Sequence, residues 1–148
     1  MCAFNSRHSP TDPFNLERFV HAQDRVYQRV LSELRAGQKM SHWMWFIFPQ
    51  VRGLGRSTIS IEYAISSRDE ARAYLQHPLL GPRLKECTQL LLQVEDRSAL
   101  EIFGEPDDVK FRSSMTLFTN VSSEDDIFER ALKKYFGGVP DRLTLARL

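Results

Sequence analysis

Apolar residues recur at helical spacing along almost the whole chain, and this period restricts the possible folds more than any other feature. The first stripe, with spacings of three, four and seven residues, consists of Phe19, Val20, Val26, Tyr27, Val30, Leu31 and Leu34. Asp12-Pro13 predicts the start of this helix, with Asp12 as cap and Pro13 at the first helical position. Gly37 predicts its end, because glycine readily adopts the left-handed conformation that closes a last turn. A break at Gln23-Asp24 is an alternative, since Asp24 can cap a second helix.

Capping patterns divide the rest of the chain into further helices. Residues 67–70 and 98–101 both match the capping box, in which a serine and a glutamate each satisfy a free amide of the first turn. Pro106 followed by two aspartates predicts another helix start. Gly137-Gly138 predicts the end of the next helix, and the residues after it form a short terminal helix or a tail.

Two short segments are compatible with a helix or with a strand. Residues 42–48 follow Ser41, which can cap a helix, and precede Pro49, which disfavours its continuation. A buried strand is the alternative, but no second strand with clear alternation is available to pair with it. Residues 58–61 are β-like in composition, whereas Ser57 is a good cap for a helix there. The patterns together predict an all-α fold, a compact multihelical single domain of six to eight short helices.

Length and charge limit the classes of function. The 148 residues have the size of one domain, and 20 Lys+Arg scattered among 19 Asp+Glu give no reason to expect a nucleic-acid partner. We predict one helical domain at 12–148 after a disordered lead-in at 1–11. The lead-in lacks the features of a secretory signal, and no stretch is long enough to be a membrane anchor. Because Cys2 and Cys87 suggest no disulfide framework, a cytoplasmic location is the simplest expectation.

Residues 41–57 contain both tryptophans of the chain, two closely spaced glycines and two arginines. Glycines let successive amides point at one spot, a serine can start a helix with an electropositive amino end, and guanidiniums grip phosphate or carboxylate oxygens. A purine or nicotinamide ring can stack on tryptophan. The segment therefore predicts a pocket for a small anionic ligand, such as a nucleotide or an ADP-ribose-like molecule. The candidate ligand-binding residues are Trp43, Trp45, Arg52, Gly53, Gly55, Arg56 and Ser57.

The same segment has two other interpretations. In the first, the glycines are turn residues, the arginines are solvated and both tryptophans belong to the core. In the second, exposed members of the aromatic run form a contact patch for a protein partner or a second copy of the chain. A concave pocket beside the tryptophans favours the ligand, and a flat or convex face favours the partner.

Few other residues suggest chemistry. His42 is the best candidate for proton transfer, although it can equally hydrogen-bond a carbonyl and help to seat Trp43. The histidines have no companions at metal-ligand spacing, so no metal site is predicted, and no cofactor can be named. Cys87 lies among leucines, which would raise the pKa of its thiol and make it a packing residue. The polar positions beside Met115 that could reach a pocket, or lie on an exposed helix face, are Lys110, Arg112, Ser113 and Ser114.

Three motifs carry a resemblance to a known family. The run His42-Trp43-Met44-Trp45-Phe46-Ile47-Phe48-Pro49-Gln50, the following Gly53-Leu54-Gly55 and the stretch from Tyr74 to Leu84 resemble the bacterial domain-of-unknown-function family 1810. That family includes a mycobacterial conserved hypothetical protein with a multihelical fold, and some members carry the label calpastatin. The resemblance covers the chain from about Asp12 to its end. It implies a helical fold and brings no reaction, cofactor or catalytic residue with it.

Overall fold

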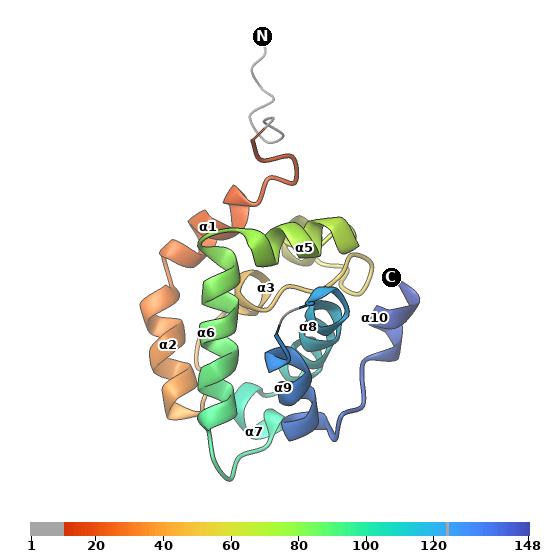
Figure 1. The fold of residues 1–148 in the computed structure, drawn as a ribbon. Helices are drawn as coiled ribbons and strands as arrows, with labels where there is room; N and C mark the ends of the chain where they lie inside the picture. Colours follow the sequence, from red (N-terminus) through yellow and green to blue (C-terminus); the bar gives the residue numbers. More distant parts are fainter. Residues whose placement is uncertain (1–10, 124) are drawn as a thin grey trace.

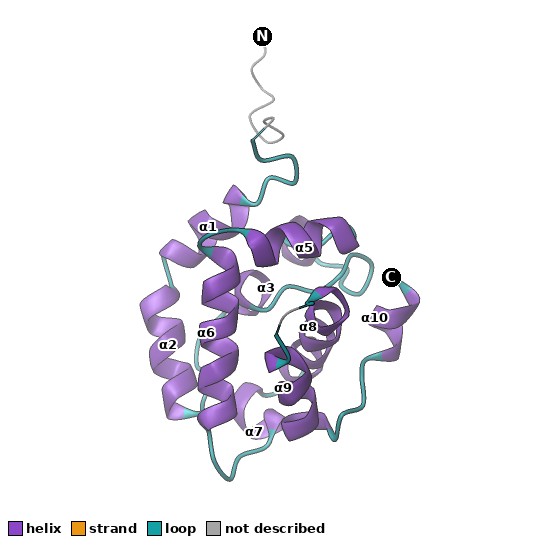
Figure 2. Cartoon of the chain, in the orientation of Figure 1, coloured by secondary structure: helices purple, strands orange, loops and turns teal. Residues whose placement is uncertain are grey.

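The computed structural model describes residues 11–123 and 125–148, so the predicted lead-in lies outside the described residues except for Thr11. Over the described residues the chain forms ten helices and no strand (Figures 1 and 2). The helices are α1 (Glu17–Asp24), α2 (Tyr27–Ala36), α3 (Met44–Ile47), α4 (Thr58–Glu62), α5 (Arg68–Gln76), α6 (Leu80–Gln93), α7 (Ala99–Phe103), α8 (Asp107–Val121), α9 (Ile127–Phe136) and α10 (Arg142–Ala146). None of these helices is long and apolar enough to cross a membrane.

The all-α class is confirmed, but the predicted number of six to eight helices is too low. The first apolar stripe is broken into α1 and α2, as the alternative for this segment proposed, but the break lies at Arg25-Val26 and Asp24 does not cap α2. Both ambiguous segments contain helices, α3 and α4, and the terminal segment contributes α10. Residues 51 and 65, on either side of α4, form one isolated parallel bridge.

Most of the predicted helix ends are confirmed, since they depend on residues close in sequence. Gly37 ends α2 with φ 70°, and Ser98 forms a complete capping box with Glu101. The start of α1 was predicted too early. The Asp12 carboxylate does accept from the amides of Leu16 and Glu17, but Asn15 has φ 54° and so interrupts the helical backbone before Glu17.

Two long helices organise the molecule. Helix α6 packs against α2, α5 and α9, and α8 packs against α5, α7, α9 and α10 (Figure 1). The short helix α3 lies at the centre with α1 against it. The chain segment that holds both tryptophans is therefore anchored in the middle of the fold.

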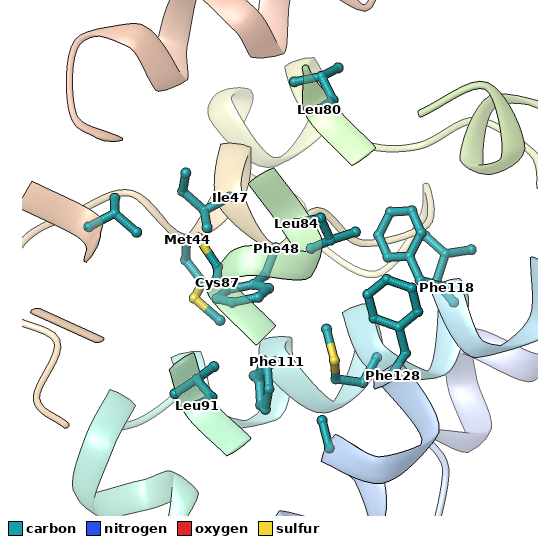
Figure 3. Packing of buried hydrophobic residues seen from close by; sticks show 14 of the residues in the cluster. Met44, Ile47, Phe48, Leu80, Leu84, Cys87, Leu91, Phe111, Phe118 and Phe128 are labelled. Carbon is teal, nitrogen blue, oxygen red and sulfur yellow. The ribbon is translucent and has the colours of Figure 1, made fainter. Parts of the chain in front are cut away.

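Side chains from α3, α6 and α8 meet in one buried cluster (Figure 3). Phe48, directly after α3, packs edge to face on Phe111 of α8 with ring centroids 5.0 Å apart. Cys87 of α6 is fully buried beside them, and burial raises the pKa of its thiol to about 12. The predicted packing role of Cys87 is confirmed.

Candidate functional site

The backbone that leads into the aromatic run is held by the carboxylate of Glu33 on α2. One carboxylate oxygen accepts from the amides of Met40 and Ser41, at 2.8 and 3.2 Å, and from Trp43 Nε1 at 2.8 Å. The other accepts from Ser41 Oγ at 2.6 Å. The prediction that Ser41 caps the following helix is wrong, because its hydroxyl is bound to Glu33 and α3 begins only at Met44.

Trp43 lies wholly in the core. Its side chain is 0% exposed, its indole N–H is bound to Glu33, and the Lys39 ammonium lies 5.1 Å from its ring centroid. A ligand ring cannot stack on an indole that has no free face. Trp43 is therefore left out of the candidate site. For this residue the interpretation that places the tryptophans in the core is correct.

Glu33 makes the stability of this region dependent on pH. Burial alone would raise the pKa of its carboxyl group, but the hydrogen bonds from Ser41, Met40 and Trp43 outweigh burial and lower the pKa below the ordinary 4.5. On acidification the unfolded chain takes up a proton first, so the contribution of Glu33 is complete above pH 4.5 and is lost as the pH falls through the folded-state pKa.

We expect the stability difference between wild type and Glu33→Gln to shrink below pH 4.5. The glutamine side chain does not titrate, whereas the wild-type carboxylate loses its additional stabilisation of the fold on protonation. Thermal unfolding of both proteins between about pH 7 and about pH 3 measures this difference, and the other acidic groups cancel in the comparison. A constant difference over the whole range would show that Glu33 is not the responsible group.

Trp45 lies beside a narrow slot between α3, the loop of residues 52–56, α4 and α8. The slot is lined on its polar side by Trp45, Gln50, Gly55, Ser60, Tyr63 and Lys110. Its free space is about 10 Å³, enough for about one water-sized group. We call this space the Trp45 slot.

Trp45, which lines the slot, carries a hydrogen-bond donor that is left without a partner. The Nε1 atom of Trp45 is buried and has no acceptor among the described residues. The ammonium of Lys110 lies 5.1 Å from the centroid of the same indole ring, close enough for a cation–π interaction. Lys110 is 3.6 Å from one oxygen of Asp107, whose other oxygen is bound at 2.8 Å by Lys39. The two lysines thus share one carboxylate.

Gly55 allows the loop of residues 52–56 to approach α4. A Cβ atom on Gly55 would lie 2.6 Å from Cβ and 2.7 Å from Oγ of Ser60. Ser57 caps α4 as predicted, because its hydroxyl oxygen accepts from the amide of Ser60. Gly55 of the predicted segment therefore forms one wall of the slot. Ser57 caps α4, and α4 forms the neighbouring wall.

The remaining candidate residues lie around the slot and not in it. Arg52 is exposed and lines a separate cleft of about 580 Å³, while Arg56 is exposed near Gly55. Gly53 has φ 100° and is covered by the side chain of Arg147. His42 is exposed and lines neither the slot nor this cleft, so it is not brought together with the other candidates.

Of the polar positions on α8, only Lys110 lines the slot. Arg112 donates to the carbonyl of Val139 and Ser113 to the carboxylate of Asp141, so both are used in holding the C-terminal segment. Ser114 is fully buried, and its Oγ has no partner within the described residues. Within residues 11–123 and 125–148 no group of three or more His, Cys, Asp or Glu side chains could hold a metal ion.

The aromatic run does not form an exposed patch. Within residues 43–48 four side chains are buried, and only Trp45 and Phe46 are partly exposed. Phe46 packs on Tyr63 with ring centroids 5.3 Å apart. Recessed aromatic residues beside a concave slot favour a ligand over a protein partner at this place.

Comparisons with known proteins give a family and a fold. The model of the family described as "Protein of unknown function (DUF1810)" matches residues 13–148. The crystal structure of the conserved hypothetical protein Rv1873 from Mycobacterium tuberculosis, at 1.38 Å, is similar with a TM-score of 0.91 and 59% sequence identity. That match covers 93% of this chain and 98% of the mycobacterial one. The comparison with curated proteins found no match.

Proposed function

The chain belongs to the DUF1810 family of proteins of unknown function, as its motifs indicate, and we propose that it binds a small anionic ligand at the Trp45 slot. The observation that carries the proposal is the buried Nε1–H of Trp45 without an acceptor. An indole N–H can only donate, and a buried donor left unpaired costs about 1–3 kcal/mol. A ligand oxygen that accepts this hydrogen bond recovers that free energy.

Lys110 determines the charge of the preferred ligand. Its side chain is 22% exposed, and its ammonium is held only loosely by Asp107, at 3.6 Å. A carboxylate or phosphate oxygen at the slot would therefore accept from Trp45 and interact with a lysine at the same time. Hydrogen bonds with an ionised partner are roughly twice as strong as neutral ones, so an anion is favoured over a neutral acceptor such as water.

The size of the slot limits how the ligand can bind. A free space of about 10 Å³ admits one oxygen-sized group, whereas a pocket that encloses a drug-sized molecule has about 300–1,000 Å³. The body of a nucleotide or an ADP-ribose-like ligand would thus lie outside the slot, over the loop of residues 52–56. The two arginines of that loop remain candidates for contacts with the body of the ligand.

The two tryptophans provide a direct test, because the chain contains only these two. Their indole N–H groups give separate signals in a ¹H–¹⁵N spectrum, and Trp45→Phe assigns them. Trp43 is bound to Glu33 in the core and serves as the internal reference. Titration with acetate and with methyl phosphate is expected to shift the Trp45 signal saturably and to leave the Trp43 signal unchanged.

Lys110→Met should weaken binding of both anions by about tenfold, because it removes the charge and keeps the length of the side chain. Lys133→Met is the matched control, since Lys133 is an exposed lysine on α9 with its own partner, Glu129, at 3.9 Å. The proposal is wrong if neither anion moves the Trp45 signal, or if the Lys110 and Lys133 variants bind alike.

A further inference from the structure

The guanidinium group of Arg147, after α10, lies directly on the turn at Gly53. A Cβ atom on Gly53 would be 2.4 Å from Nη1, 2.5 Å from Cζ and 2.9 Å from Nε of Arg147. The guanidinium therefore occupies the space that any side chain at position 53 would need. Gly53 is required here both for φ 100° and for this close approach.

Arg147 is held in place by contacts between α10 and α8. The carboxylate of Asp141 accepts from the amide of Thr144 at 2.9 Å and from Ser113 Oγ at 3.2 Å. The amide of Asp141 in turn donates to Thr116 Oγ1 at 2.9 Å. Helix α8 also carries Lys110, so one helix positions both the lysine of the slot and the arginine on the glycine turn.

Three exposed arginines lie on or beside this loop. Arg52, Arg56 and Arg147 are all exposed, and none forms an ion pair within residues 11–123 and 125–148. The chain as a whole is close to neutral, with 20 basic and 19 acidic residues. The cleft beside Arg52 also contains two glutamates: Glu70 is bound by Arg18 at 2.9 Å, whereas the exposed Glu62 forms no ion pair within the described residues, so Arg52 faces a negative charge.

The slot and Arg147 are close enough to serve one ligand group. Gly55 lines the slot and Gly53 contacts Arg147, and two residues of extended chain span at most about 7 Å. Resting on the proposed function, we infer that Arg147, with Arg56, forms a subsite that selects a dianionic phosphate monoester over a monocarboxylate. One phosphate oxygen enters the Trp45 slot, and the others face the guanidinium groups, whose planar forks suit phosphate.

The test compares two probes on three arginine variants. At about pH 8 methyl phosphate is a dianion, because the second pKa of a phosphate monoester is about 6, and acetate carries one charge. Arg147→Ala is expected to weaken methyl phosphate binding about tenfold and to change acetate binding less than about twofold, as followed by the Trp45 indole signal. Arg142→Ala is the matched control, an exposed arginine at the other end of α10. Compared with Arg147→Ala, Arg147→Lys should recover part of the preference for methyl phosphate over acetate, since lysine keeps the positive charge but lacks the planar fork.

The outcomes separate this inference from the proposed function. If acetate still moves the Trp45 signal and Arg147→Ala leaves methyl phosphate affinity unchanged, the subsite is refuted and the anion slot stands. If Arg147→Ala weakens the binding of both probes equally, Arg147 only positions the loop. That result would also overturn the inferred selectivity for phosphate. If no probe moves the Trp45 signal in the wild type, the proposed function fails and the subsite fails with it. An unchanged Trp43 signal in each variant shows that the fold is intact.

Discussion

Glu33→Ala is expected to lower the free energy of unfolding by at least about 3 kcal/mol. The substitution removes the acceptor of four hydrogen bonds from Met40, Ser41 and Trp43. The indole N–H of Trp43 then stays unpaired in the core, because its ring is fully buried and water cannot reach it without rearrangement. A buried donor that loses its partner costs about 1–3 kcal/mol, and an indole and two amides lose theirs together.

Glu33→Gln provides the matched comparison. The amide oxygen can still accept from the indole and the two backbone amides, and the amide nitrogen can donate to the Ser41 hydroxyl. Only the charge assistance is lost, so we expect a decrease of about 1 kcal/mol at neutral pH. Urea unfolding of the three proteins measures both values. Equal losses for alanine and glutamine would contradict this account, since they would assign the stability to the charge and not to the acceptor.

Local patterns predicted the helices well wherever the capping partner lies within a few residues. Ser98 and Glu101 satisfy each other three residues apart, and the left-handed Gly37 depends on its own conformation alone. Ser41 has an equally good capping pattern, but its hydroxyl is taken by Glu33, eight residues earlier on another helix. A tertiary acceptor that competes for a capping side chain leaves no mark in the local sequence.

The site was predictable only in part for a similar reason. The predicted segment, residues 41–57, supplies Trp45 and Gly55, and both line the slot. The assignment of both tryptophans to stacking does not hold for Trp43, because Trp43 precedes α3 and its fully buried indole is bound to Glu33, whereas Trp45 on α3 is partly exposed. Lys110 was predicted only as one of four polar positions that could reach a pocket, and Arg147, which packing of α10 on α8 brings next to Gly53, was not predicted.

Gly81→Ala is expected to destabilise the fold by at least about 3 kcal/mol, although alanine in a helix is ordinarily more favourable than glycine by about 1 kcal/mol. Gly81 lies in the first turn of α6, where that helix packs on α5. A Cβ atom there would be 2.1 Å from the carbonyl oxygen and 2.9 Å from the carbonyl carbon of Leu75. Both are backbone atoms, so no side-chain rotation relieves the clash, and α5 and α6 must separate.

This separation would reach beyond the helix pair. The imidazole of His77 accepts from the amides of Leu79 and Leu80 at 3.1 and 3.2 Å and thereby fixes the turn between α5 and α6, as expected for a turn residue. Movement of α6 would disturb that turn and the core contacts of Leu84 and Cys87 (Figure 3). Thermal and urea unfolding measure the loss of stability.

Gly137→Ala is the control that separates the clash from the conformational preference of glycine. Gly137 has φ 63° but no atom within 4 Å of its ideal Cβ position, so its substitution carries only backbone strain of about 1 kcal/mol. Gly81 shows the opposite combination, because its backbone is helical but a Cβ atom has no space there. If the two variants lose the same stability, or if Gly81→Ala gains stability, the close approach of α5 to α6 at Leu75 cannot be a requirement of the fold.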